Sequence, residues 1–226
     1  MKIVEQEVTC LDFMGTDLSV VNAARVSMYK QSVYLHDDYG EDFLKLEDTK
    51  LLNYLAKHKH WTPFAHCFLS FRIKAPIFVA RQLAKHQVGL VWNEVSRRYV
   101  SDEPEFYVPD KWRLKADNVK QGSGEDHNNQ LECEDVYDYF LQEALYNYQY
   151  LINTKVCPEQ ARMLLPQSMM TEWIWSGSLL AFNRICSLRL DTHTQKETQE
   201  VAKKLNDYCK KYFPESWDAL TTYANI

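Results

Sequence analysis

Residues 67–74, with the sequence CFLSFRIK, alternate regularly between apolar and polar side chains. The positions on one face are Cys67, Leu69, Phe71 and Ile73. A period of two is typical of a β-strand that buries one face. The dipeptide Ala75-Pro76 follows at once, and proline is favoured in the first turn of a helix because the N–H group that it lacks has no partner there. The sequence therefore predicts a half-buried strand that leads directly into a helix, which ends by Gly89.

Other periodic segments place further strands and helices along the chain. Residues 1–8 are predicted as an edge strand, 93–100 as an extended segment and 169–175 as a strand. Helices are predicted at 18–28, 48–58, 134–154 and 178–188, with a helical turn at 159–166 and a final long helix that Pro214 ends. The strands and helices do not alternate as regular βαβ units. This favours an α+β fold with a central antiparallel or mixed β-sheet flanked by helices.

The helix patterns also predict caps and buried stripes. We expect Asp48 to cap its helix, and Asp191 or Thr192 to cap the last one. Arg25, near the end of its helix, is expected to be solvated. The stripe expected to face inward on the helix 134–154 consists of Val136, Phe140, Ala144, Tyr148 and Leu151.

The composition is that of one globular domain over residues 1–226, with a polar surface insertion around 101–130. Hydrophobic residues make up 46% and charged residues 25% of the chain. The net charge of −5 argues against a general nucleic-acid-binding protein. No apolar run approaches the ~18 residues that a membrane span needs, and MKIVEQEV lacks the apolar stretch of a signal peptide. We therefore expect a cytoplasmic protein without a membrane or nucleic-acid partner, whose six scattered cysteines are reduced, mostly buried thiols.

Residues 81–98 form the most basic part of this acidic chain. Its basic side chains are Arg81, Lys85, His86, Arg97 and Arg98. The cluster contains one carboxylate, Glu94, and is suited to an anion, since a phosphate takes two or three Arg, Lys or backbone N–H donors. Arg162, Arg184 and Arg189 lie far away in the sequence. A site shared with them has to be assembled by tertiary structure or between subunits.

Two other chemistries are less well supported. His58, His60 and His66 invite a zinc site, but their spacing does not suit one helix face and no cysteine or carboxylate completes a set. Ser96 and His86 could act as nucleophile and base, but no GxSxG elbow or partner acid accompanies them. No GxGxxG or P-loop motif is present.

The basic stretch and the segments around it resemble the flavin-dependent thymidylate synthases, over nearly the whole chain. The family signature RQxxRHRxxSxNExSxRY appears here as RQLAKHQVGLVWNEVSRRY. Five supporting blocks occur in the family order: AARVS at 23–27, HWTPFAH at 60–66, APIFVARQ at 75–82, EQARMLLP at 159–166 and LRLDTHTQ at 188–195.

The sequence departs from the family pattern at several positions. Lys85-His86-Gln87 replaces RHR, and eight residues rather than seven separate Gln87 from Ser96. Ala65 stands where the family usually has Glu. Ser178 and Leu180 stand where the family usually has Asn and Arg as flavin contacts.

The resemblance implies the fold of that family and a homotetramer whose active sites lie between subunits. It implies conversion of dUMP to dTMP, with a methylene group from 5,10-methylenetetrahydrofolate and a hydride from FADH2 that NADPH regenerates, and with no metal. The positions that match dUMP-binding residues are Gln82, Lys85, Glu94, Ser96, Arg97, Arg98, Arg162 and Arg189, of which Arg189 is the catalytic candidate. The positions that match FAD-binding residues are Ser27, His60, Thr62, His86, Gln87, Asn93 and His193.

Two rival hypotheses remain open. The altered Lys85-His86-Gln87 motif and the absent Glu at Ala65 are compatible with a degenerate member that binds nucleotide or flavin without turnover. A non-enzymatic nucleotide-binding oligomeric protein is the rival from another class. Binding of FAD and turnover of dUMP distinguish the three.

Overall fold

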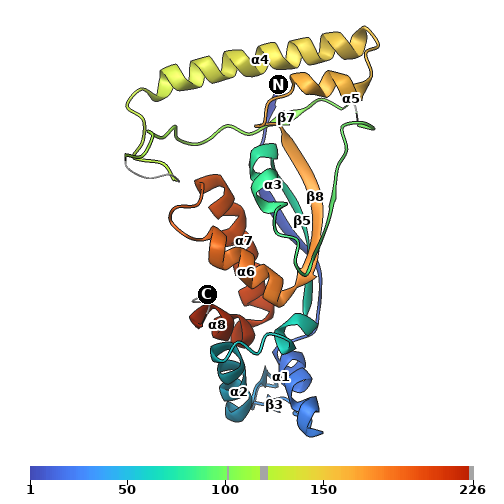
Figure 1. Ribbon diagram of the computed structural model, residues 1–226, viewed down its shortest axis with the longest axis vertical. Coiled ribbons are helices and arrows are strands. Elements are labelled where there is room, and N and C mark those ends of the chain that lie inside the picture. The colour runs from blue at the N-terminus through green and yellow to red at the C-terminus, as the bar shows by residue number, and fades with distance from the viewer. Residues whose placement is uncertain (101, 118–121, 224–226) are drawn as a thin grey trace.

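The computed structural model of the chain describes residues 1–100, 102–117 and 122–223 (Figure 1). The strands are β1 (Lys2–Ile3), β2 (Glu7–Met14), β3 (Leu35–His36), β4 (Asp42–Phe43), β5 (Phe68–Pro76), β6 (Leu90–Glu94), β7 (Glu105–Phe106) and β8 (Met170–Ser178). The helices are α1 (Asp17–Arg25), α2 (Leu46–Lys57), α3 (Ile77–Leu83), α4 (Gln130–Asn153), α5 (Pro158–Ala161), α6 (Leu179–Arg189), α7 (Lys196–Tyr212) and α8 (Pro214–Thr222). Short 3₁₀ turns are η1 (Val26–Met28), η2 (Pro63–His66) and η3 (Arg162–Leu164).

The centre of the molecule is a four-stranded sheet with the order β2-β5-β8-β6. All of its neighbouring strands are antiparallel, which confirms the predicted α+β fold with a helix-flanked antiparallel sheet. The strand predicted at 1–8 is divided: β2 is an edge strand that continues to Met14, and β1 pairs separately with β7. The segment predicted as extended at 93–100 instead contributes its first two residues to β6, which starts at Leu90.

One face of the sheet carries the main core. Leu69, Phe71 and Ile73 on β5 are buried, as their alternation predicts. Phe71 and Trp175 each meet the ring of Phe182 on α6 edge-on, at centroid distances of 4.9 and 5.6 Å. A side chain of this size stabilises the fold by about 1.5–3 kcal/mol when it is fully buried. Figure 1 shows α3, α6 and α7 on this side of the sheet.

The opposite face of the sheet is open within the described chain. Phe68, Arg72 and Ile174 are exposed there, and so is Val91 on the edge strand β6. Ser70 and Ser176 share a hydrogen bond of 2.8 Å across the middle of this face. Apolar side chains on an uncovered sheet face are typical of an interaction surface.

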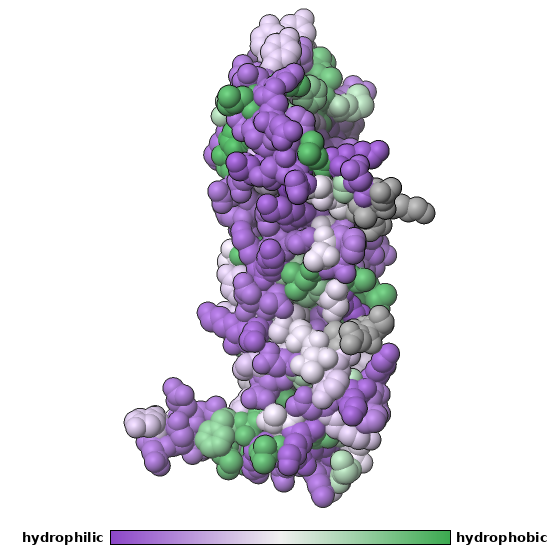
Figure 2. All heavy atoms as spheres, turned by 90° about the vertical axis from the view of Figure 1, so that its left-hand side faces the viewer, coloured by the Kyte–Doolittle hydropathy of each residue, from purple (hydrophilic) through white to green (hydrophobic). Residues whose placement is uncertain are grey.

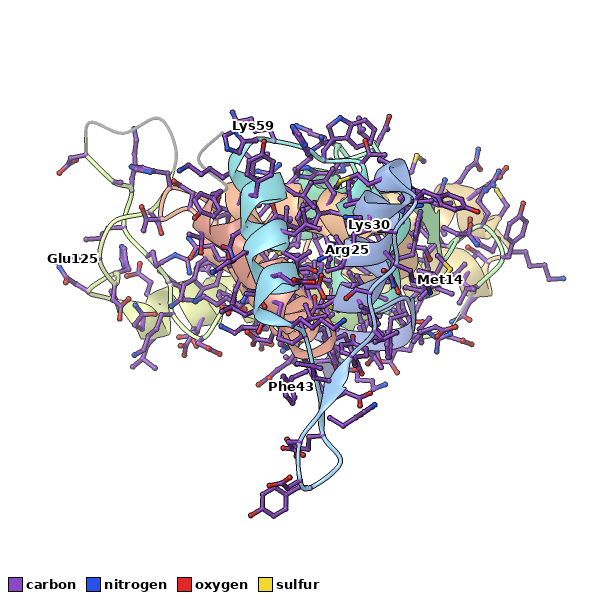
Figure 3. The ribbon with its side chains drawn as sticks, turned by 90° about the horizontal axis from the view of Figure 1, so that it is seen from below. Met14, Arg25, Lys30, Phe43, Lys59 and Glu125 are labelled. Carbon is purple, nitrogen blue, oxygen red and sulfur yellow. The ribbon has the colours of Figure 1, made fainter. Side chains whose placement is uncertain are left out.

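The molecule is elongated, with α4 across one end and α1, α2 and the β3–β4 hairpin at the other (Figure 1). A second core of Phe106, Leu141, Leu145 and Met169 joins α4 to β7 and the start of β8. Figure 2 shows the side that carries α7 as largely hydrophilic, with apolar residues in separate patches. Seen from below, the hairpin projects from the body with Phe43 near its base (Figure 3).

Several local expectations were wrong. Helix α2 begins at Leu46 with Lys45 as its N-cap, and Asp48 is instead buried inside the first turn. Arg25 is not solvated, because its Nε donates to Asp48 at 2.9 Å between α1 and α2 (Figure 3). A charge buried without a partner is costly, so Arg25 helps to neutralise the buried carboxylate of Asp48, which also accepts from Ser32 Oγ.

Other differences concern the later helices. Gln195, rather than Asp191 or Thr192, is the N-cap of α7. Pro214 ends the last predicted helix but also begins α8, which sequence periodicity missed. On α4, Ala144 and Tyr148 are buried as expected, whereas Val136 and Phe140 are 66% and 50% exposed. The exposed apolar side of α4 has no cover within the described chain.

The insertion predicted around 101–130 includes residues 101 and 118–121, which lie outside the described part. Its described residues do not all lie at the surface, since Phe106 is fully buried. Trp112, Leu114 and Gly124 belong to a hairpin-like arm, residues 112–117 and 122–127, held by backbone hydrogen bonds such as Leu114 N to Glu125 O at 2.8 Å. No described helix combines the length and apolar character needed to cross a bilayer.

Candidate functional site

A polar pocket of about 330 Å³ lies where α3, the end of α6 and the start of α7 meet. It is lined by Gln82, Lys85, Gly122, Arg189, His193, Thr194 and Gln195. We call it the polar pocket. Gln82 comes from α3 and Lys85 from the turn after it, while Arg189 is the last residue of α6. The structure thus brings four of the predicted site residues, Gln82, Lys85, Arg189 and His193, into one concave site.

Arg189 is anchored along one edge of its guanidinium. Its Nε donates to His86 Nε2 at 3.0 Å, and its Nη2 donates to the carbonyl oxygen of Gln82 at 3.2 Å. Its Nη1 has no hydrogen-bond partner within the described residues. Because two of the three nitrogens are held by protein, the orientation of the guanidinium is fixed before a ligand arrives. A fixed guanidinium is suited to stabilising negative charge on a ligand oxygen.

His86 is held in its neutral form. Burial lowers the pKa of His86, and the positive charge of Arg189 lowers it further. Arginine has only donors, so the Nε2 atom of His86 must accept and its ring proton must lie on Nδ1. Burial also lowers the pKa of Arg189, but a guanidinium still carries its charge at neutral pH.

The side chain of Gln82 is fixed at both ends of its amide. Its Nε2 donates to Oε1 of Gln195, and its Oε1 accepts from Oγ1 of Thr198 at 3.2 Å. Gln195 is the N-cap of α7 and Thr198 is a fully buried residue of its first turn. The position of Gln82 in the polar pocket therefore depends on how α7 begins.

His193 stands at the rim of the polar pocket on an exposed turn. Its backbone N–H and its Nδ1 both approach Oδ1 of Asp191, at 2.8 and 2.9 Å. These contacts lower the pKa of Asp191. Asp191 thus orients the imidazole in place of capping the next helix.

A second group of predicted residues lies at the end of β6, away from the polar pocket. Glu94 is held by Oγ1 of Thr171 at 2.6 Å and by Nε1 of Trp92 at 3.2 Å. Both the backbone N and the Nε of Arg98 approach Ser96 Oγ at 3.4 Å. Arg97 donates to the carbonyl oxygen of Asp102. Its basic side chains are suited to an anion, but among the described residues no hydrogen bond or ion pair connects the group to Arg189.

Six predicted residues belong to neither group, and five of them lie outside the central sheet. Ser27 in η1 is exposed, Gln87 is exposed in the turn before β6, and Thr62 is exposed just before η2. His60 lines a separate apolar pocket of about 250 Å³ with Trp61 and Phe64. Arg162 is exposed in η3, where its Nε contacts the carbonyl oxygen of Glu159 at 3.3 Å. Within one chain these residues do not converge with the polar pocket.

Asn93, the remaining predicted residue, pairs with Ile174. It therefore points to the open face of the sheet, while the polar pocket lies on the helix side.

The structure does not support the other chemistries. Among the residues that the structure describes, no group of three His, Cys, Asp or Glu could hold a metal ion. Ser96 and His86 share no hydrogen bond, since the first contacts Arg98 and the second Arg189. All six cysteines are free, but only Cys67, Cys186 and Cys209 are buried. Burial raises the pKa of Cys67 to about 12, which disfavours a thiolate nucleophile.

Four residues of the site were not singled out from the sequence. Gln195 and Thr194 belong to the block LRLDTHTQ, which carried the resemblance, so the signal for them was present. Thr198 follows in the first turn of α7 and reads only as a polar helix residue. Gly122 lies in the insertion, whose contact with the polar pocket has no sequence signal.

Comparisons with known proteins agree on one family. The family model described as thymidylate synthase complementing protein matches residues 9–215. A flavin-dependent thymidylate synthase of Thermosipho africanus is 34% identical over 217 residues, covering 95% of this chain and 90% of that protein. One of Thermus thermophilus is 36% identical over 213 residues, covering 94% and 74%. The UMP/dUMP methylase PolB from Streptomyces cacaoi, solved with bound 5-Br dUMP, has a TM-score of 0.85 and 28% identity, covering 98% of this chain and 97% of that one.

Proposed function

Because this chain belongs to the thymidylate synthase complementing protein family, we propose that it methylates dUMP to dTMP in a flavin-dependent reaction. The observation that carries the proposal is the Arg189 guanidinium, held by His86 and Gln82 at the wall of the polar pocket. The chain is a methyltransferase, as the named relatives and the methylase neighbour indicate. The proposal concerns its substrate, its cofactors and the roles of its residues.

The polar pocket fits the pyrimidine part of a nucleotide. Uracil presents two carbonyl oxygens and an N–H group, and the amides of Gln82 and Gln195 offer donors and acceptors of the same kind. The Nη1 atom of Arg189 would contact a uracil carbonyl oxygen. As C5 of the ring becomes nucleophilic, negative charge grows on that oxygen and the guanidinium stabilises it.

The phosphate would bind to the basic residues that follow β6. Ser96, Arg97 and Arg98 would contact it, with Glu94 on the sugar side and Arg162 supplied by a neighbouring subunit. An arginine fork can bind a phosphate through two parallel hydrogen bonds. Ser96 is then a ligand donor, in agreement with the absence of a hydrogen bond to His86.

The donor set also fits a flavin, although the described residues of one chain do not enclose it. Small-molecule sites usually measure about 300–1,000 Å³, and the polar pocket, at about 330 Å³, lies at the lower limit. A dinucleotide such as FAD therefore requires further walls. Ser27, His60, Thr62, His86, Gln87, Asn93 and His193 would hold it. When bound, FAD would supply the hydride, and NADPH and 5,10-methylenetetrahydrofolate would act as co-substrates.

The dispersal of the site residues favours a homotetramer with active sites between subunits. The two groups of predicted residues, and those that belong to neither, are spread over one elongated chain. Arg162 begins η3, directly after α5, which lies beside α4 at one end of the molecule (Figure 1). Two apolar surfaces are available for contacts between copies. One is the open face of the sheet with Phe68 and Ile174, and the other is the side of α4 with Val136 and Phe140.

Methylation of UMP is a second candidate activity. The neighbour PolB is named a UMP/dUMP methylase and was also solved with bound 5-Br UMP, with a TM-score of 0.84 and 26% identity to this chain. The two substrates differ only in the ribose 2′-hydroxyl group. Turnover of UMP and dUMP measured side by side decides between them.

The proposal is tested by loading the protein with FAD and following turnover. The purified protein should show flavin absorbance and, without oxygen, convert dUMP to dTMP with 5,10-methylenetetrahydrofolate and NADPH. A colourless protein that takes up no FAD would refute flavin dependence. A protein that binds FAD and dUMP but produces no dTMP would be the degenerate member.

A further inference from the structure

Arg113 and Glu197 form a largely buried ion pair beside the polar pocket. Nη2 of Arg113 lies 2.7 and 3.0 Å from the two carboxylate oxygens of Glu197. The side chains are only 18% and 5% exposed. The residues are 84 positions apart in the sequence, so the pair joins two distant parts of the chain. A carboxylate buried to this degree is tolerated only when a partner neutralises it.

The pair connects the insertion to the start of α7. Arg113 lies on the hairpin-like arm, where its backbone forms an isolated antiparallel β-bridge with Asp126. Glu197 is in the first turn of α7, next to Thr198 and two residues after the N-cap Gln195. The arm also reaches the polar pocket itself, because Gly122 is one of its lining residues.

Residues at the start of α7 bind the side chain of Gln82. Gln195 and Thr198 bind the two ends of the Gln82 amide, and the carbonyl oxygen of Gln82 accepts from Arg189. Gln6 adds a second contact to this turn, since its Nε2 donates to the carbonyl oxygen of Glu197 at 3.1 Å. Every link from Arg113 to Arg189 is therefore a hydrogen bond, an ion pair or one turn of helix.

We propose that Arg113 is a positioning residue: its ion pair with Glu197 fixes the first turn of α7 and thereby holds Gln82 in the polar pocket. Arg113 does not line the polar pocket, so it acts through Gln195 and Thr198 and not on a ligand. The inference rests on the proposed function only for the choice of dUMP and FAD as probes.

A double-mutant cycle on the full-length protein tests the proposal. Arg113→Ala and Gln82→Ala are made singly and together, and the dissociation constants for dUMP and FAD are measured by titration. We expect each single change to weaken dUMP binding by about 10-fold, the size of an ordinary coupling between residues of one network. In the Gln82→Ala background, Arg113→Ala should add little further loss, because the residue through which it acts is gone.

Two further variants separate positioning from general stability. Arg113→Met combined with Glu197→Gln removes both charges at similar side-chain size. The double variant should therefore fold, but its affinity for dUMP should be lower than that of the wild type. Arg113→Lys should recover part of the affinity. Lys74→Ala is the control: Lys74 is also partly buried and paired with a carboxylate, Glu105, but among the described residues no hydrogen bond or ion pair joins Lys74 to α7. Its dUMP affinity should match that of the wild type.

Hydrogen exchange of the peptides covering 190–200 gives a readout without ligand. Exchange there should be faster in Arg113→Ala than in the wild type, and unchanged in Lys74→Ala. Additive losses in the double-mutant cycle, or wild-type affinity in the Met/Gln variant, would overturn the proposal. If the wild type binds neither dUMP nor FAD, the proposed function fails, and unchanged exchange in Arg113→Ala would then refute the positioning role separately.

Discussion

Arg189 and His86 share a hydrogen bond of 3.0 Å in which the guanidinium donates and the imidazole accepts. The pair joins the end of α6 to the turn after α3, across 103 positions of sequence. It fixes the tautomer of one residue and the orientation of the other. The first two predictions follow from this bond.

Replacing Arg189 with alanine should lower turnover of dUMP by about 10²–10³, the usual effect of losing one charge-stabilising donor. Arg189→Lys tests whether the charge alone is sufficient. Lysine keeps the positive charge but lacks the planar fork that contacts His86 and Gln82, so we expect it to recover only a small part of the turnover. Single-turnover rates on FAD-loaded protein check both variants, and a wild-type rate in Arg189→Ala would refute the role.

The stability of the protein should fall on acidification through the titration of His86. Its ordinary pKa is 6.5, and the folded protein holds it lower. Below pH 6.5 the unfolded chain therefore binds a proton that the folded protein does not yet bind. Above pH 6.5 His86 is neutral in both states and does not lower the free energy of unfolding. As the pH falls from 6.5 through the pKa of the folded state, protonation of the unfolded chain lowers the free energy of unfolding.

Thermal melting between pH 8 and pH 5 measures this effect, with His86→Gln as the control. Glutamine can accept a hydrogen bond from Arg189 but does not titrate. The melting temperature of the wild type should therefore drop more steeply below pH 6.5 than that of His86→Gln. Parallel curves would show that His86 does not contribute.

The sequence pattern was sufficient to place an element and its buried face where burial alone decides the structure. The alternation of Leu69, Phe71 and Ile73 placed β5 correctly, because a strand with one buried face has a period of two. The same kind of pattern did not identify the buried face of α4. Val136 and Phe140 share the apolar pattern of Ala144 and Tyr148 but are exposed. An apolar stripe shows that a helix has a contact face, and does not show whether the same chain covers it.

The site was predicted in its parts but not in its connections. The family blocks contain Gln82, Lys85, Arg189 and His193, which the polar pocket brings together. The bond from Gln82 to Gln195 spans 113 positions. Neither it nor the pairing of Arg113 with Glu197 leaves a periodic signal, because such contacts arise only when distant elements come together.

The pairing of β6 with β8 should not tolerate a side chain at position 177, which is Gly177. A Cβ atom there would lie 2.5 Å from Cδ2 of Leu90 and 2.6 Å from the carbonyl oxygen of Gly89. Gly177→Ala should therefore destabilise the protein by about 1–3 kcal/mol, as overpacking does. Gly124→Ala is the matched control, since the nearest atoms to its Cβ would be the carbonyl oxygens of Leu114 and Lys115, at 3.4 Å. Denaturant unfolding of both variants checks the difference, and equal midpoints would contradict it.

Arg162→Ala should weaken dUMP binding and leave stability nearly unchanged. Arg162 is exposed, and the hydrogen bond from its Nε to the carbonyl oxygen of Glu159 is long, at 3.3 Å. Surface substitutions of this kind usually change stability by about 0.5 kcal/mol or less. Titration with dUMP measures the binding, with Lys210→Ala as a control for loss of a surface charge far from the site. An unchanged affinity in Arg162→Ala would remove it from the phosphate site.

Assembly and ligand binding should be lost together when the exposed side of α4 is made polar. Phe140 is 50% exposed on this side, and a lysine there would bury a charge in any contact between copies. We expect Phe140→Lys to reduce the mass measured by light scattering from that of a tetramer and to weaken dUMP and FAD binding. Gln142→Lys adds the same charge on the opposite side of the helix, two positions or about 200° away, and should remain assembled. A wild type that binds dUMP as a monomer, or a Phe140→Lys variant that stays tetrameric, would show that this side of α4 is not needed to complete the site.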